Sequence, residues 1–210
     1  MAHRTAPHRR NYCATVTTDA TPGIVVGVDG TPRCAWGAST PDYVDYHDHE
    51  WGRPLTGETE LFERLCLEGF QAGLAWITIL RKREGFRAAF RGFDPVIVAA
   101  FDADDVDRLL HDAAIVRHRG KIEAAVQNAR ALLVLHEQGI TLHELLWAHA
   151  DPRRPAPRTP HDVPSTTPAS HALSRTLRRH GFRFVGPTTA YAAMQAVGVV
   201  NDHLEGCHAR

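Results

Sequence analysis

The stretch from Ser39 to Pro54, STPDYVDYHDHEWGRP, concentrates side chains that could carry chemistry. It holds two tyrosines, two histidines, three aspartates, a glutamate and a tryptophan in sixteen residues. No amphipathic helix or strand period accounts for this mixture. Three interpretations are open: a set of metal ligands, a catalytic cluster, or a polar loop over a core.

Two pairs of cysteine and histidine lie far apart in the chain and could share one metal ion. Cys34 precedes His47 by thirteen residues, and His203 precedes Cys207 by four, so one turn or bend could present the second pair. Structural zinc takes four such ligands in tetrahedral geometry and keeps no open position. The alternative is chance, since the chain has fourteen histidines.

A carboxylate falls on an apolar helical stripe. In ETELFERLCLEGFQAG, Leu61, Leu65 and Glu68 follow one another at i, i+4 and i+7. A buried carboxylate destabilises a protein unless it is paired or serves a function. Glu68 could form a binding site with Trp76 and Tyr46. The plainer alternatives are a capping or ion-pairing role for Glu68 and a core position for Trp76.

The segment from Ile115 to Lys121, IVRHRGK, predicts a short turn between two helices. Such a turn directs backbone N–H groups outward and can hold a phosphate. Arg117, Arg119 and Lys121 add positive charge beside it. The ordinary alternative is a solvated loop.

The composition limits the class of protein. The chain has 210 residues, of which 43% are hydrophobic and 23% charged, and its formal net charge is zero. Any contact with nucleic acid must therefore come from local patches. Because no apolar run is long enough to span a membrane and the start lacks a signal-peptide pattern, we expect a cytoplasmic protein with no membrane partner. In that compartment its four cysteines are poor candidates for disulfides.

The pattern of elements predicts an all-α fold of about eight helices. Residues 1–32 are expected to form a disordered or loosely ordered tail, in which GIVVGV could be a short strand. Capping signals occur at Asp94-Pro95, at Asp102 and at Thr141 with Glu144. Helices are expected over 58–73, 73–90, 95–101, 102–113, 142–150, 171–180 and 187–200, with a long helix between the turn and Gly139 and a proline-rich loop over 151–169.

Taken together, these residues resemble the bacterial 3-methyladenine DNA glycosylase I family. The similarity runs from Arg33 to about Cys207 and rests on motifs in the same order and at compatible spacing. They are RCAW, YHDHEWGRP, LFERLCLEGFQAGLAWITILRKRE, FDP, RHRGKI, NAR, FVG and MQAVGVVNDH.

The resemblance implies a two-lobed helix-hairpin-helix glycosylase domain over 33–210. It implies one structural Zn²⁺ per chain, which joins the two ends of the domain and is bound by Cys34, His47, His203 and Cys207. Its base pocket would contain Tyr46, Trp51, Glu68 and Trp76, with Glu68 as the catalytic candidate. The DNA backbone would lie on Arg117, Arg119, Gly120 and Lys121.

The resemblance also implies the reaction: a monomeric DNA repair enzyme excises 3-methyladenine from double-stranded alkylated DNA and leaves an abasic site. Ala114 departs from the family, which commonly has glycine just before the turn. The chain has no aspartate between Lys121 and Ala150, the region where many helix-hairpin-helix glycosylases place a catalytic carboxylate; the family resembled lacks it too.

The expected chemistry does not require that aspartate. Methylation at N3 makes adenine cationic and weakens its glycosidic bond. The enzyme must flip the nucleotide, recognise the base and admit water. The indole of Trp76 can stack on a cation, Glu68 can accept hydrogen bonds from the amine edge, and Tyr46 can read another edge.

Two other functions compete with this interpretation. His47-Asp48 is the dipeptide of HD-type metal phosphohydrolases, but their metal needs further His and Asp ligands and open positions. A helical DNA-binding module with structural zinc would need no carboxylate beside a tryptophan. Metal content tests the first alternative, and base release from methylated DNA tests the second.

Overall fold

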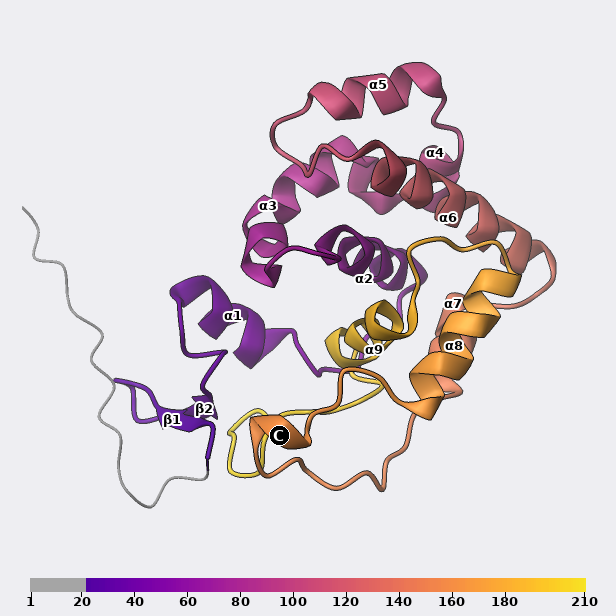
Figure 1. Cartoon of the computed structure of the whole chain (residues 1–210). Coiled ribbons are helices and arrows are strands. Elements are labelled where there is room, and N and C mark those ends of the chain that lie inside the picture. The colour runs from indigo at the N-terminus through magenta and orange to yellow at the C-terminus, as the bar shows by residue number, and fades with distance from the viewer. Residues whose placement is uncertain (1–21) are drawn as a thin grey trace, which may run out of the picture.

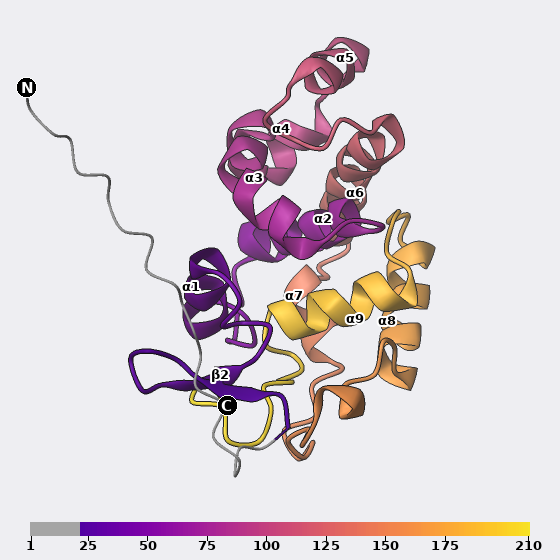
Figure 2. The ribbon, with the colours of Figure 1, turned by 60° about the vertical axis from the view of Figure 1, so that its left-hand side comes forward.

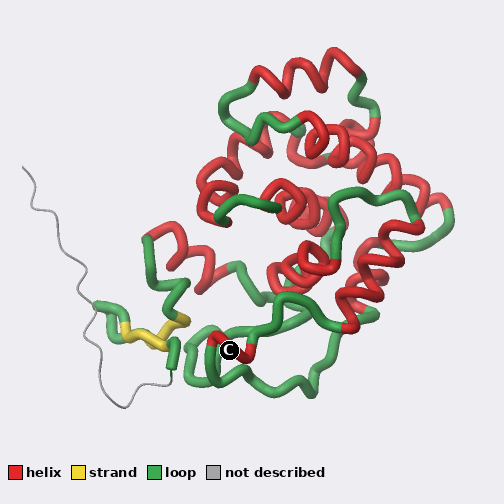
Figure 3. Tube along the Cα trace, in the orientation of Figure 1, coloured by secondary structure: helices red, strands yellow, loops and turns green. Residues whose placement is uncertain are grey.

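The computed structural model describes residues 22–210, and this part of the chain is mostly helical, as expected (Figures 1 and 3). It contains nine α-helices, two short 3-10 helices and one two-stranded sheet. None of its helices is both long and apolar enough to cross a membrane. The elements are β1 (Ile24–Val26), β2 (Pro32–Cys34), α1 (Pro41–His49), α2 (Glu58–Gln71), α3 (Trp76–Ala89), η1 (Arg91–Phe93), α4 (Pro95–Ala99), α5 (Ala103–His111), α6 (Arg119–Glu137), α7 (Leu142–Trp147), η2 (Pro160–Asp162), α8 (Pro168–Arg179) and α9 (Pro187–Ala196).

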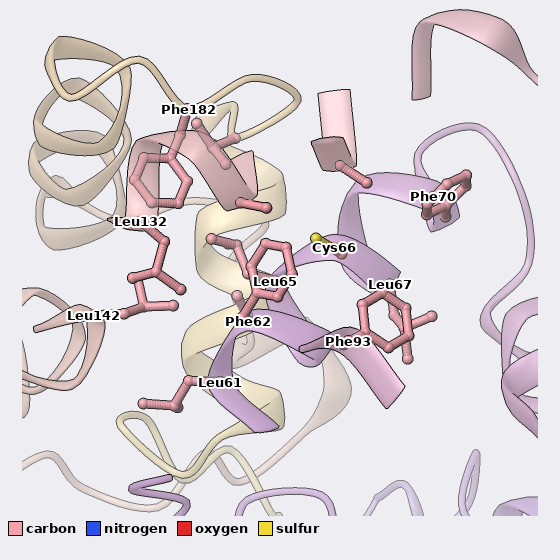
Figure 4. Packing of buried hydrophobic residues seen from close by; sticks show 14 of the residues in the cluster. Leu61, Phe62, Leu65, Cys66, Leu67, Phe70, Phe93, Leu132, Leu142 and Phe182 are labelled. Carbon is pink, nitrogen blue, oxygen red and sulfur yellow. The ribbon is translucent and has the colours of Figure 1, made fainter. Parts of the chain in front are cut away.

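Helix α2 is the centre of the fold. Every residue from 61 to 70 is buried, so the helix has no solvent face over that stretch. Helices α3, α6, α7 and α9 contact it from different sides (Figures 1 and 2). Figure 4 shows Phe62 and Leu65 of α2 among apolar side chains that include Phe93, Leu132 and Phe182. A polar group on α2 is therefore held inside the protein.

Local capping chemistry begins several helices where the sequence predicted. The carboxylate of Asp94 accepts hydrogen bonds from two amides of α4, and that of Asp102 does the same for α5. Thr141 and Glu144 form the expected capping box at α7. Helix α6 ends just before Gly139, which has a positive φ of 73°. These starts and ends are confirmed.

Helix α1 is the main element that the sequence did not predict. The hydroxyl of Thr40 accepts a hydrogen bond from the amide of Tyr43 at 3.2 Å, and Pro41 occupies the first turn. Its buried residues are the consecutive Tyr46, His47 and Asp48. Because these side chains face aromatic and metal-ligand-type residues rather than an apolar core, the helix shows no hydrophobic period.

Several helix boundaries also differ from the expectation: α3 begins at Trp76 rather than at residue 73, and α7 ends at Trp147 rather than at residue 150. Helix α8 begins at Pro168, three residues early, because Thr167 and Ser170 form a capping box. Helix α9 ends at Ala196, because Gly198 has a positive φ of 78° and turns the chain.

The sheet is a short antiparallel hairpin that pairs Ile24 with Cys34 and Val26 with Pro32. The strand expected in GIVVGV is confirmed. Residues 24–32 therefore belong to this hairpin, residues 22 and 23 form a turn before it, and the remainder of the expected tail, 1–21, lies outside the described residues.

The turn between α5 and α6 packs on α3. The ammonium group of Lys82 donates a hydrogen bond to the carbonyl of Ala113 at 2.6 Å. A Cβ atom on Gly85 would lie 2.6 Å from the carbonyl oxygen of Ala114 and 2.8 Å from its Cβ. Gly85 thus gives Ala114 the room that its methyl group needs.

This close approach generates a stability prediction. Gly85→Ala should lower the free energy of unfolding by about 1–3 kcal/mol in a urea titration, because the new methyl group overlaps backbone as well as side chain. Gly120→Ala is the matched control: it also lies in a helix, and its nearest neighbour, a ring carbon of His118, would be 3.4 Å away. Equal effects of the two substitutions would contradict the proposed packing.

Candidate active site and metal-ligand cluster

Four buried side chains converge beside the hairpin and the chain's C-terminal segment: Cys34, His47, His203 and Cys207. Their ligand atoms all lie within 4.8 Å of one another. The Nδ1 atom of His203 lies 3.2 Å from Nε2 of His47, 3.6 Å from Sγ of Cys207 and 3.9 Å from Sγ of Cys34. Cys207 Sγ is 3.4 Å from Nε2 of His47. These residues could hold one metal ion.

Outer hydrogen bonds orient both histidines toward the cluster. The Nδ1 atom of His47 donates to Asp48 at 2.7 Å, which leaves Nε2 pointing inward. The Nε2 atom of His203 donates to the carbonyl of Trp51 at 2.9 Å, which leaves Nδ1 pointing inward. Asp48 also accepts hydrogen bonds from Arg33 at 2.9 and 3.0 Å and from His208 at 2.8 Å.

The two thiols of the cluster differ in pKa: hydrogen bonding with Cys207, together with burial, raises the pKa of the Cys34 thiol above its usual range. The hydrogen bond from Cys34 lowers the pKa of the Cys207 thiol far below its usual range, with further help from His203 and His47 and against the effect of burial. The thiolate is the form of cysteine that binds metals.

An aromatic cavity of about 340 Å³ lies next to this cluster. The four residues that the sequence predicted for the base pocket all line it: Tyr46, Trp51, Glu68 and Trp76. The rings of Tyr46 and Trp76 lie 5.4 Å apart between centroids. Trp51 joins the two sites, since its ring lies 4.7 Å from that of His203. The structure therefore brings all four predicted pocket residues together.

Glu68 is the unusual member of the cavity. Only 5% of its surface is exposed, and it comes from the enclosed helix α2. Burial raises the pKa of its carboxyl to about 8, and the positive charge of Arg64 opposes this only in part. At neutral pH the free protein thus holds much of this group in its uncharged form.

A charged network fixes the wall behind Tyr46. Arg83 donates two hydrogen bonds to the carboxylate of Glu50, at 2.6 and 2.8 Å, and Arg64 forms an ion pair with the same carboxylate. The guanidinium of Arg64 lies 5.6 Å from the centre of the Tyr46 ring. Burial opposes the ionisation of Glu50, but these arginines lower its pKa to about 2.

The basic turn differs in part from the expectation. Arg117 is exposed, and Arg119 is exposed but pairs with Asp107 at 2.6 Å. Gly120 lies in the first turn of α6. The ammonium group of Lys121 is not at the surface: it donates to the carbonyls of Phe70 and Ala72 at 2.7 and 2.6 Å.

Lys121 therefore ties the start of α6 to the C-terminal end of α2, where the helix dipole favours a cation. Burial lowers the pKa of its ammonium. The sequence predicted a lysine in a basic turn, but it did not show that the Lys121 side chain would point into the protein, toward α2.

Sequence reasoning missed several residues of the cavity: Trp36, Ser39, Tyr43, Gln71, Ala192 and Gln195. Gln71 could have been found, because it follows Glu68 by three residues on the same helix. Trp36 lies in the RCAW motif. Gln195 gave no sequence signal, since its place depends on how α9 packs. Leu74, 39% exposed in the loop after α2, does not line the cavity. Its backbone exchanges two hydrogen bonds with Gln71, which does: the Gln71 side chain donates to the Leu74 carbonyl, and the Leu74 amide donates to the Gln71 carbonyl.

Comparison with known proteins identifies the family of this chain. The family model for methyladenine glycosylase matches residues 36–210. DNA-3-methyladenine glycosylase 1 of Escherichia coli (strain K12) is 50% identical over 177 residues, which cover 83% of this chain and 95% of that protein.

Solved structures share the fold. A crystal structure of a 3-methyladenine DNA glycosylase I has a TM-score of 0.81 at 48% identity, covering 84% of this chain and 98% of that one. A Tyr→Phe variant of such a protein, in complex with 3-methyladenine, has a TM-score of 0.79 at 37% identity and covers 84% and 96% of the two chains. The resemblance seen in the motifs is confirmed: the chain belongs to the methyladenine glycosylase family.

Proposed function

We propose that this chain is a DNA repair enzyme that flips 3-methyladenine out of double-stranded alkylated DNA and hydrolyses its N-glycosidic bond. The observation that carries the proposal is the buried carboxyl of Glu68, which lines an aromatic cavity of about 340 Å³. Such a cavity has room for one purine and offers a cationic base two matched partners, π faces and a carboxylate.

Each pocket residue has a role in this proposal. Trp76 stacks on the flipped base, and Trp51 closes the wall next to the metal-ligand cluster. Tyr46 faces one edge of the base, held by Arg64. Glu68 accepts hydrogen bonds from the amine edge and is the catalytic residue that we assign, because it touches the leaving group.

The reaction needs little acid chemistry. The base leaves with the electron pair of the bond to C1′ and becomes neutral, while water adds to C1′ and loses a proton. The positive charge of the base favours the ionised form of Glu68, so binding should displace the proton that burial retains. A neutral adenine gains no such electrostatic stabilisation from ionised Glu68. This difference favours excision of the methylated, cationic base over that of normal adenine.

Release of 3-methyladenine from methylated DNA tests this function. Glu68→Gln should lower kcat/KM by about 10- to 150-fold, because a charge-assisted hydrogen bond contributes about 1.5–3 kcal/mol. With the carboxyl pKa raised to about 8, the wild-type kcat/KM should rise with pH up to about 8, and the variant should lose this rise.

The controls separate chemistry from folding. Glu60→Gln, an exposed change on the same helix, should leave activity unchanged.

The folded state keeps the Glu68 proton between pH 4.5 and about 8, so wild-type stability falls as pH rises through that range. Glu68→Gln avoids this loss and should be the more stable protein at pH 8. No base release by the wild type would overturn the proposal and favour a DNA-binding module.

We further infer that the four-residue cluster binds one structural Zn²⁺. Zinc bond lengths to sulfur and nitrogen set tetrahedral edges of about 3.3–3.8 Å. Four of the six separations between ligand atoms, from 3.2 to 3.9 Å, are close to those edges. The ion would cross-link the β2–α1 region to the C-terminal segment. With four protein ligands it keeps no open position, which argues against the HD-type phosphohydrolase alternative.

Cysteine variants test the metal. The wild type should contain one zinc per chain by elemental analysis, and Cys207→Ala should lose it and melt at a lower temperature. Cys66→Ala is the matched control, because Cys66 is equally buried but lies in the apolar core; it should keep the zinc. Wild-type protein without zinc, unchanged when zinc is added, would contradict the assignment.

We propose that DNA lies on the turn between α5 and α6, as in a helix-hairpin-helix. Amides of the turn and of Gly120 hold a phosphate, and Arg117 and Arg119 supply charge. Lys121 serves this grip indirectly by fixing the turn to α2. The enzyme acts as a monomer, because one chain provides all of these groups, and it works in the cytoplasm, where bacterial DNA is held.

A salt series tests the placement of DNA. Arg117→Ala should weaken DNA binding and reduce the slope of log affinity against log salt by about one, because one phosphate contact is lost. Binding of free 3-methyladenine should not change. The control is Arg153→Ala, an exposed arginine on the proline-rich loop, which should leave the slope unaltered. An unchanged slope in Arg117→Ala would place DNA elsewhere.

A further inference from the structure

Phe184 is an exposed aromatic residue in a strained conformation. Its φ is 53°, in the left-handed region that bulky residues rarely adopt, and 42% of its surface is exposed. The flanking apolar residues Phe182 and Val185 are buried. The chain thus turns the aromatic side chain of Phe184 outward, between Phe182 and Val185, whose side chains are buried.

Buried polar side chains hold the backbone on both sides of Phe184. Asn128 accepts a hydrogen bond from the amide of Arg183 at 2.7 Å and donates one to its carbonyl at 3.1 Å. Ser174 donates to the carbonyl of Val185 at 2.6 Å. Each of these two side chains is only 2% exposed. Strain of this kind persists only where surrounding contacts determine the conformation, and it clusters at functional sites.

The position of Phe184 connects the two proposed sites. Its ring lies 6.4 Å from that of His118, which caps α6 at the basic turn. Its Cβ would be 3.5 Å from a Cβ atom on Gly69, the residue that follows Glu68. Arg178 and Arg183 are exposed nearby, on the end of α8 and in the same loop. Phe184 therefore stands between the turn and the helix that carries the carboxylate.

We propose that Phe184 contacts DNA: its ring packs on the sugar and base next to the flipped nucleotide, on the strand that the turn holds. This inference rests on the proposed placement of DNA at the turn. Exposed phenylalanine between arginines suits this surface, since aromatic side chains stack on bases or wedge between them without reading sequence. Among the other exposed apolar residues, Val96 and Val134 lie on regular helices, whereas Val28, Trp36 and Leu74 lie in turns or bends that do not adjoin the basic turn in sequence.

The test uses full-length protein and a duplex that carries an abasic-site analogue. Phe184→Gly should weaken duplex binding by about tenfold, the range expected for one lost stacking contact. Binding of free 3-methyladenine should not change. Because glycine accepts a positive φ, the melting temperature should stay the same or rise. A 2-aminopurine beside the analogue should fluoresce more in the variant complex than in the wild-type complex.

Controls distinguish the possible failures. Val134→Ala, a change at an exposed apolar site on α6, should not affect duplex binding. If Phe184→Gly changes affinity by less than twofold while Arg117→Ala still lowers the salt slope, Phe184 is not a contact and the DNA placement stands. If neither variant changes DNA binding, both assignments are wrong. A joint loss of melting temperature and free-base binding in Phe184→Gly would show a structural role instead.

Discussion

The enclosure of helix α2 is the constraint on which the site depends. A helix with no solvent face over ten residues normally carries few charged side chains, yet this one buries Glu63, Arg64 and Glu68, and Glu68 lines the cavity. Desolvation keeps the carboxyl partly protonated and destabilises the fold as pH rises. The same desolvation makes the carboxylate a strong partner once a cation arrives. Lys121 donates hydrogen bonds to two carbonyls at the C-terminal end of this helix. The position of the Glu68 carboxyl is therefore fixed by this anchor as well as by the helices that pack around α2.

The metal-ligand cluster and the cavity form one structure. Tyr46 and His47 are neighbours on α1, and they face the cavity and the cluster respectively. Trp51 lines the cavity with its ring and accepts a hydrogen bond from His203 with its carbonyl. Asp48 links His47 to Arg33 and His208. An ion in the cluster would therefore act on the pocket through geometry, by holding α1 against the C-terminal segment.

Interactions between residues close in sequence made much of the fold predictable, whereas contacts between elements distant in sequence could not be predicted. Caps at Asp94, Asp102 and Thr141 are short-range interactions, so the sequence shows them directly. Helix α1 escaped prediction because its buried face is polar and aromatic. The pocket residues were found through their motifs, but Gln195 depends on the packing of α9. Lys121 was misplaced for a related reason: only the tertiary fold shows that carbonyls of α2 lie within its reach.

The order of these parts along the chain has a consequence for biosynthesis. Every residue that lines the cavity, up to Gln195, precedes His203 and Cys207. A growing polypeptide can thus assemble α2 and much of its core while the ring of Trp51 still lacks its histidine neighbour. The pocket would gain its final shape only after the late histidine and cysteine emerge.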